Sequence, residues 1–168
     1  ERRRKPGEKI VRKSRLSPGR DYIESIFYLN EEEIARQKII NEEVVESSGE
    51  IPEGRVDFLD EFKKTYGIEY YVEGKKSGPS RTYFADGQPN IEAYFQWGKL
   101  LWKREYYNDG HIRLEVNYED AREQSDEKER GVGRVYYRDG AIKYEWNLTR
   151  SEKIGFKKSY NQDGALRA

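Results

Sequence analysis

Apolar and polar residues alternate over much of the second half of the chain. After Gly110, apolar residues occupy every second position from 112 to 118, and positions 142–148 repeat the arrangement after Gly140. A period of two over about eight residues predicts a half-buried β-strand. The stretches that precede these glycines alternate as well. Two such stretches around a turn predict a β-hairpin.

Four copies of one ten-residue pattern carry these hairpins. Each copy has a basic residue, a spacer, a Tyr, two further residues and Asp-Gly; the pairs are Asp86-Gly87, Asp109-Gly110, Asp139-Gly140 and Asp163-Gly164. A recurring pattern is typical of a small unit stacked on copies of itself. We therefore predict an all-β fold, an elongated single-layer antiparallel sheet of consecutive hairpins over residues 66–168.

The hydrophobic pattern also selects a turn. A two-residue Asp-Gly turn would place Arg104 opposite Glu115. A three-residue loop, with a left-handed glycine forming a bulge, would instead unite two apolar stripes on one face: Trp102, Tyr106, Ile112, Leu114 and Val116. Because a one-residue slip exchanges the faces of a strand, we predict the three-residue loop and positive φ at all four glycines.

The front of the chain departs from the repeat. Residues 27–40 fit either strands or a helix starting at Asn30 with Glu33 as its capping-box partner. The apolar residues from 34 to 45 do not form a helical stripe, so strands are favoured. We divide the chain into a basic arm (1–20), degenerate first repeats (21–53) and a repeat sheet (54–168) with a polar insertion (119–130).

Charge is unevenly spread although the net charge is zero. Residues 1–20 hold nine Lys and Arg against two Glu, which gives +7, so the other 148 residues carry −7. A basic arm can bind nucleic acid or anionic lipid. We favour a solvated, partly disordered tail, or an arm that lies on its own acidic body.

The composition says little about the cellular compartment in which the protein acts. The 168 residues include no Cys, so disulfides and thiolate metal sites are excluded. No apolar run approaches the roughly 18 residues of a membrane-spanning helix. The chain has no Met and begins at Glu1, so a signal or anchor segment could have been removed, and we lean towards an extracytoplasmic location.

Catalytic chemistry is not indicated. His111 is the single His and follows a turn glycine, which favours a surface turn residue over a metal ligand or a triad member. The four Asp residues recur at one position of the repeat, which indicates turn chemistry instead of an acid–base pair. We predict no enzyme and no cofactor.

The candidate binding residues form columns across the predicted sheet. Ten basic and aromatic side chains belong to them: Arg81, Tyr83, Trp102, Arg104, Tyr106, Arg134, Tyr136, Trp146, Lys158 and Tyr160. On an uncovered face they suit a peptide, a sugar or an anionic headgroup, through stacking and cation–π contacts. The alternative, which we favour, is that they only hold adjacent hairpins together as cross-strand pairs.

The repeat also resembles a known family. The Tyr-x-x-Asp-Gly motif, the Glu five residues later (Glu92, Glu115, Glu145) and the links at 74–78 and 151–155 are similar to MORN repeats. The resemblance is closer to the bacterial variant of YwqK-type antitoxins. It implies an elongated antiparallel sheet, a role in protein or membrane association and, for an antitoxin, a toxin partner. Leu101 and Asn161 depart from the pattern.

These observations favour a non-catalytic repeat module that binds a protein partner. Two alternatives remain at this stage. One is a membrane- or envelope-associated module that uses the basic arm and the aromatic face on an anionic membrane surface. The other is an antitoxin or immunity protein that neutralises a toxin. Nucleic acid is disfavoured as a partner.

Overall fold

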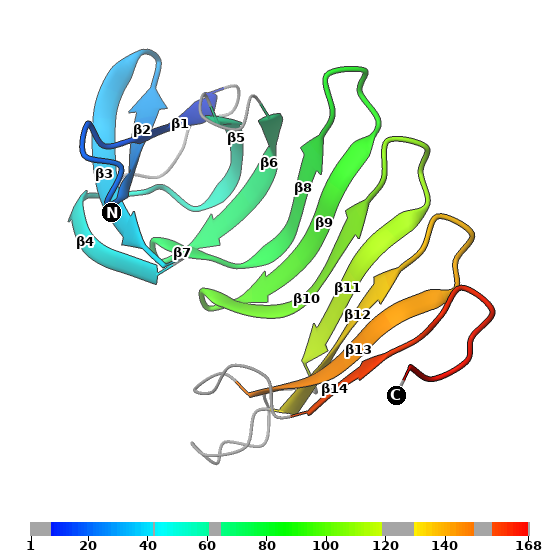
Figure 1. Ribbon diagram of the computed structural model, residues 1–168. Helices are drawn as coiled ribbons and strands as arrows, with labels where there is room; N and C mark the ends of the chain where they lie inside the picture. Colours follow the sequence, from blue (N-terminus) through cyan, green and yellow to red (C-terminus); the bar gives the residue numbers. More distant parts are fainter. Residues whose placement is uncertain (1–7, 42, 61–64, 119–129, 150–155, 168) are drawn as a thin grey trace.

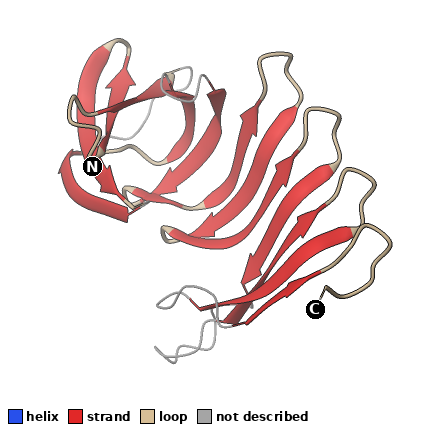
Figure 2. Cartoon of the chain, in the orientation of Figure 1, coloured by secondary structure: helices blue, strands red, loops and turns tan. Residues whose placement is uncertain are grey.

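The computed structural model describes residues 8–41, 43–60, 65–118, 130–149 and 156–167 (Figures 1 and 2). In those ranges the chain is all-β and builds one open sheet. Its fourteen strands are β1 (Ile10–Leu16), β2 (Ile23–Leu29), β3 (Glu32–Ile40), β4 (Glu43–Gly49), β5 (Gly54–Asp60), β6 (Thr65–Val72), β7 (Lys75–Lys76), β8 (Gly78–Tyr83), β9 (Pro89–Gln96), β10 (Lys99–Tyr106), β11 (Ile112–Tyr118), β12 (Arg130–Tyr136), β13 (Ile142–Thr149) and β14 (Phe156–Ser159). The predicted fold class is confirmed.

The sheet has two differently shaped halves. Strands β8 to β14 follow one another as antiparallel neighbours, whereas β1 lies between β2 and β5 and pairs with β5 in parallel. The sheet is therefore mixed, which corrects the purely antiparallel expectation. Figure 1 shows β1 to β6 curling round, while β8 to β14 spread into an open row of hairpins. Most of the predicted insertion (119–129) and the link at 151–155 lie outside the described residues.

Part of the predicted basic arm is a central strand. In β1 the side chains of Ile10, Arg12 and Ser14 are buried, and the residues between them are more exposed. The expectation of a solvated tail is wrong for Ile10–Leu16. The many charges masked a period-two pattern in this segment, and the pattern fits a half-buried strand.

The hydrophobic core lies inside the curl. It consists of Ile10, Phe27, Leu29, Ala35, Ile51, Val56 and Tyr71. The rings of Phe27 and Tyr71 meet edge to face, with centroids 5.4 Å apart. Strands β2, β3 and β4 confirm the strand prediction for this region. No helix starts at Asn30, because Asn30 and Glu31 have φ of 50° and 70° and form the turn between β2 and β3.

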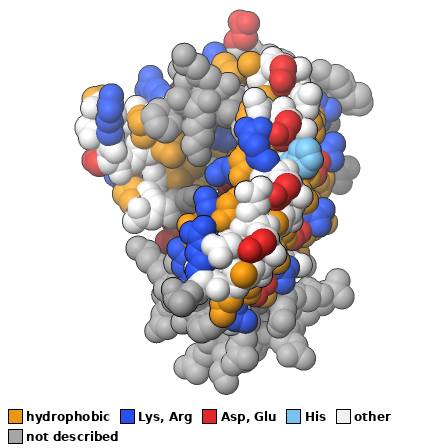
Figure 3. Space-filling model, turned by 45° about the vertical axis from the view of Figure 1, so that its right-hand side comes forward, with side chains coloured by type: hydrophobic (Ala, Val, Ile, Leu, Met, Phe, Trp, Pro, Cys, Tyr) orange, Lys and Arg blue, Asp and Glu red, His pale blue; other side chains and the backbone are white. Residues whose placement is uncertain are grey.

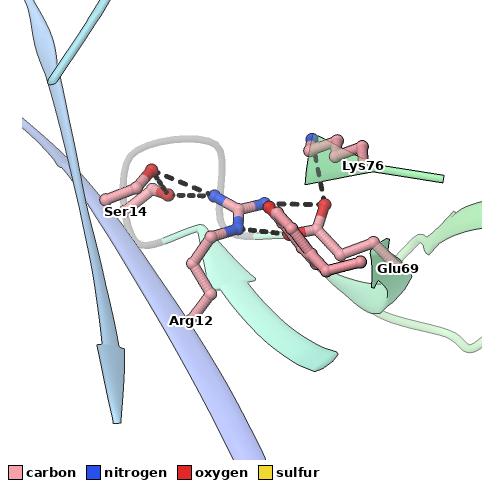
Figure 4. Close-up of polar contacts among 6 residues, drawn as sticks. Arg12, Ser14, Glu69 and Lys76 are labelled. Carbon is pink, nitrogen blue, oxygen red and sulfur yellow. Dashed lines mark hydrogen bonds and ion pairs between the residues drawn. The ribbon is translucent and has the colours of Figure 1, made fainter. Parts of the chain in front are cut away.

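A buried ionic cluster helps to close the curl (Figure 4). Glu69 is 1% exposed; its Oε1 lies 2.5 Å from Arg12 Nε and its Oε2 lies 2.9 Å from Lys76 Nζ. The Tyr71 hydroxyl donates to Glu69 Oε1 at 2.9 Å. Burial alone would raise the pKa of Glu69, but Arg12 and Lys76 outweigh it and lower that pKa to about 2. The cluster thus joins β1 to β6 and β7.

The predicted three-residue loops are confirmed. In the β10–β11 hairpin, the Tyr107 amide donates to the His111 carbonyl at 2.8 Å, and the Gly110 amide donates to the Tyr107 carbonyl at 3.0 Å. Gly110 has φ of 85°, and Asp109 Oδ1 accepts from the His111 amide at 3.2 Å. The other three glycines have φ of 86°, 87° and 84°. Asp supplies the turn hydrogen bond and Gly supplies the left-handed backbone.

The predicted register beyond the loop is wrong. Arg104 lies opposite Glu115, because a second irregularity between Glu105 and Tyr106 gives β11 one extra residue. The same shift follows Thr82 in β8 and Val135 in β12. A bulge adds one residue to one strand, so the loop and the bulge together restore the register of a two-residue turn. Leu114 and Val116 consequently lie opposite Glu105 and Lys103, on the face away from Trp102 and Tyr106, whereas Ile112 lies opposite Tyr106 and shares its face as predicted.

We call the face that carries the core the inner face, because the curl encloses it. Cross-strand pairing continues this face from Ile10 and Val56 to Ala93 and Val116. The opposite side is the outer face. The outer face carries most of the residues predicted to bind a partner.

Candidate functional site

A row of alternating charges crosses the outer face from β8 to β14. Each member lies directly opposite the next, in the order Arg81, Glu92, Arg104, Glu115, Arg134, Glu145 and Lys158. Three ion pairs lie within hairpins: Arg81–Glu92 at 2.8 Å, Arg104–Glu115 at 2.9 Å and Arg134–Glu145 at 2.8 Å. We call this row the charge ladder.

Tyrosine hydroxyls connect the ladder from one hairpin to the next. Tyr106 donates to Glu92 Oε2 at 2.7 Å, and Tyr136 donates to Glu115 Oε2 at 3.1 Å. Burial, then the neighbouring carboxylate, raises the pKa of Tyr106. Each of these Glu residues therefore accepts from an Arg of its own hairpin and from a Tyr of the following one. This geometry gives the columns a structural role.

The structure brings most, but not all, of the predicted residues together. Trp102 lies on the outer face, with Arg104 Cζ 5.7 Å from its ring centroid. Tyr83 stacks on Tyr66, and Tyr160 forms a bridge with Leu166 beyond β14. Trp146 corrects the prediction: it lies opposite Gly133 on the inner face. A Cβ at Gly133 would lie 2.3 Å from the Trp146 ring, so the missing side chain at Gly133 leaves the space that the indole occupies.

The outer face is not a purely basic surface. The ladder contains four cations and three carboxylates, and each Arg is paired with a Glu on the neighbouring strand. Figure 3, which brings the hairpin loops forward, shows acidic side chains in a row beside the single His, with basic side chains next to them, so the loop edge of the sheet is also mixed in charge. Ion pairs at close range leave little net charge to attract a polyanion. The arrangement is therefore suited to a partner of mixed polarity.

An aromatic hollow of about 820 Å³ lies beside the ladder. Its lining includes Tyr94, Trp97, Leu101, Trp102, Asn117 and Arg134. The register places Tyr94, Trp102 and Asn117 opposite one another on the outer face. Tyr94 is 40% exposed and Trp97 is 50% exposed. Aromatic rings with open faces next to amide and guanidinium groups are typical of recognition surfaces.

Trp97 occupies a backbone conformation that does not favour it. Trp97 and Gly98 form the two-residue turn between β9 and β10, with φ of 51° and 83°. Positive φ is uncommon for a bulky residue, and such turns prefer Asn or Gly. Neither Trp97 nor Tyr94 is among the residues predicted from the sequence to bind a partner. A Trp-Gly pair between two alternating stretches was the available signal.

In the ranges that can be described, no group of three or more His, Cys, Asp or Glu is arranged to hold a metal ion. His111 is exposed, and its Nδ1 lies 3.2 Å from Asp109 Oδ1. The hydrogen bond from the His111 amide, the largest effect, lowers the pKa of Asp109. Among the described residues, none belongs to a helix long and apolar enough to cross a membrane.

One hairpin of the chain matches a known protein family. Residues 103–120, which include the second half of β10, the Asp109-Gly110 loop and β11, match the family model of the MORN repeat variant. No curated protein matches the chain. The match supports a MORN-repeat protein. The hairpins β8–β9 and β12–β13 share the loop and the bulge of the matched hairpin, so the same unit recurs on both sides of it.

Proposed function

We propose that this chain is a non-catalytic repeat module that binds another protein through the aromatic hollow of its outer face. The observation that carries the proposal is the half-exposed Trp97 at φ of 51°. Backbone strain at a bulky side chain costs of the order of 1–3 kcal/mol, and such strain clusters at functional sites. A ring held there beside Tyr94 and Trp102 forms a rigid aromatic anchor for a partner.

The repeat family and the charge ladder support the same function. A MORN-repeat match is consistent with a non-catalytic module, because these repeats are associated with protein and membrane binding. The ladder pairs each Arg with a Glu, so the outer face offers a membrane little net positive charge. The basic arm (1–20) offers a membrane less positive charge than its composition predicts, because Arg12 is buried in an ion pair with Glu69. A protein partner is therefore favoured over an anionic membrane surface.

Affinity capture from the source cells with the intact chain tests the proposal. Trp97→Asn removes the ring from the hollow, and Tyr70→Ser is the matched control, because Tyr70 is an exposed aromatic that does not line the hollow. We expect one protein to be retained by the parent and the Tyr70 variant and lost by the Trp97 variant. Equal retention by all three would contradict the proposal.

The capture experiment also separates the alternatives. A captured toxin would give the module an antitoxin role, which the YwqK-type resemblance implies. Binding to anionic vesicles by the parent and the Trp97 variant alike, without a captured protein, would favour the membrane-associated alternative. Each alternative thus has an outcome that the protein-binding proposal does not share.

A further inference from the structure

Strand β4 (Glu43–Gly49) ends the sheet as an open edge. Among the described residues it pairs only with β3, and all seven of its residues are exposed. An edge strand presents a row of unpaired N–H and C=O groups that can pair with another chain. The strand at the opposite end, β14, is four residues long, and the Tyr160–Leu166 bridge continues beyond it. The β4 edge is the longer and more open of the two.

The β4 edge also borders a groove on the inner face. The groove has a volume of about 1560 Å³; β4 supplies part of one wall, and Phe95 and Leu100 contribute to its lining from β9 and β10. Small-molecule pockets usually measure about 300–1,000 Å³, so this groove exceeds a small-molecule site. Ile39, Ile51 and Tyr71 add further apolar surface. The groove is lined by both apolar and charged side chains, and an open edge beside such a groove suits an extended polypeptide.

The register of β4 defines the side chains that such a polypeptide would carry. Val44 lies opposite Ile39, on the side of the groove, and is 51% exposed. The two carboxylates of β4 are Glu43, which lies opposite Ile40 and lines the groove, and Glu46, which lies opposite Lys38 and forms an ion pair with it at 3.0 Å. Residues directly opposite on neighbouring strands interact, and opposite charges there are favourable. A strand next to β4 would therefore place basic side chains against the carboxylates and apolar ones over the groove.

We propose that the β4 edge binds an extended segment of a partner protein by β-strand addition, and that this segment alternates basic and apolar residues. Its backbone pairs with the free edge of β4, which provides affinity, and its alternate side chains provide specificity. The apolar side chains contact Ile39, Ile51 and Phe95, and the basic ones contact Glu43 and Glu46. No residue of β4 lines the aromatic hollow, but Phe95 and Trp97 line both the hollow and the groove, so the two sites adjoin each other.

A synthetic peptide that alternates Lys with Val and Ile, acetyl-KVKIKVKIK-amide, tests the proposal by calorimetry with the full chain. The control is the same peptide with Glu in place of every Lys. We expect the basic peptide to bind roughly tenfold more tightly, because two favourable cross-strand pairs replace two repulsive ones. Equal affinities, or no binding of the basic peptide, would overturn the proposal.

Backbone methylation tests the mode of binding. Successive N–H groups of a strand point to opposite edges, so pairing with one edge uses alternate amides only. Two versions of the basic peptide, each N-methylated at one of the two alternate sets, should differ: one loses binding and the other retains it. Equal behaviour of the two would exclude strand addition. Slower hydrogen exchange of the β4 amides in the unmodified complex is the matching expectation for the protein.

Charge reversal on the protein locates the site. The double variant Glu43→Lys and Glu46→Lys should reverse the preference, so that the Glu peptide binds more tightly than the Lys peptide. The control is Glu31→Lys with Glu32→Lys, a pair of exposed carboxylates at the β2–β3 turn that do not line the groove. The control should keep the parent preference. An unchanged preference in the Glu43 and Glu46 variant would place the site elsewhere and overturn the proposal.

Discussion

Arg104 lies directly opposite Glu115, and its Nε donates a hydrogen bond to Glu115 Oε1 at 2.9 Å. The three-residue loop alone would place Arg104 opposite Leu114. The extra residue in β11 moves the pairing by one, and Arg104 meets the carboxylate. The same bulge turns Leu114 towards the inner face, so a single irregularity satisfies the charges on one side and the apolar residues on the other.

Removing ladder cations should change stability little. Arg104 and Arg134 are 46% and 38% exposed in their ion pairs, and exposed pairs contribute roughly 0–1 kcal/mol each. We expect the double variant Arg104→Ala and Arg134→Ala to lower the free energy of unfolding by less than about 2 kcal/mol in urea denaturation. Partner capture, measured in parallel, shows whether the two guanidinium groups also bind. A larger loss with unchanged capture would assign the ladder to structure alone.

Gly133 should not tolerate a methyl group. A Cβ there would lie 2.3 Å from the Trp146 ring, a rigid neighbour that cannot give way by a small rotation. Overpacking typically costs about 1–3 kcal/mol, and we expect Gly133→Ala to lower the free energy of unfolding by that amount. Adding Trp146→Leu should recover part of the loss, because the two sites are in contact. Strict additivity in this double-mutant cycle would contradict the packing.

Gly110 should be sensitive for a different reason. No atom lies within 4 Å of a Cβ built there, but φ is 85°. An L-residue in the left-handed region costs roughly 1–2 kcal/mol, and Asn is tolerated better. Gly110→Ala should therefore destabilise the chain by about that amount, and Gly110→Asn should destabilise it less, as measured by thermal unfolding. Equal losses for the two variants would remove backbone conformation as the cause.

The sequence was sufficient for features that are local. The four Asp-Gly loops and the strands favoured over a helix between residues 27 and 45 depend on residues close together in the chain, and both predictions are confirmed. The predicted strand register and the predicted face of Trp146 were wrong. A bulged residue such as Arg113 cannot be recognised from the alternation of apolar and polar residues. The central position of β1 in the sheet was not predicted, because it depends on the ion pair between Arg12 and Glu69, which are far apart in the sequence. Trp97 was not predicted as a binding residue, because its exposure depends on where the β9–β10 turn lies in the folded sheet.

Acid should weaken the curled half of the sheet through Glu69. Its pKa is lowered from 4.5 to about 2, so its contribution is present above the unfolded value and is lost as the pH falls from about 5 to about 2. The contribution is of the order of 3 kcal/mol, at 1.36 kcal/mol for each pKa unit. Glu69→Gln should destabilise the chain at neutral pH, because the buried Arg12 guanidinium then lacks the Glu69 carboxylate charge. Its stability should also vary less than that of the parent between pH 5 and pH 2.

Trp97→Asn should stabilise the β9–β10 turn while removing a binding ring. The chain itself places Asn at φ of 50° in two other turns, at Asn30 and Asn41, whereas Trp97 holds φ of 51° with a bulky side chain. Asn adopts this region at lower cost, so the variant should melt at the parent temperature or slightly above it. The ring is half exposed, so its loss removes only part of a Trp side chain from packing, and the relief of the backbone strain offsets that loss. A variant that melts clearly below the parent would mean that Trp97 packs for stability; one that melts as high and no longer retains the partner would show that the strained turn is maintained for binding.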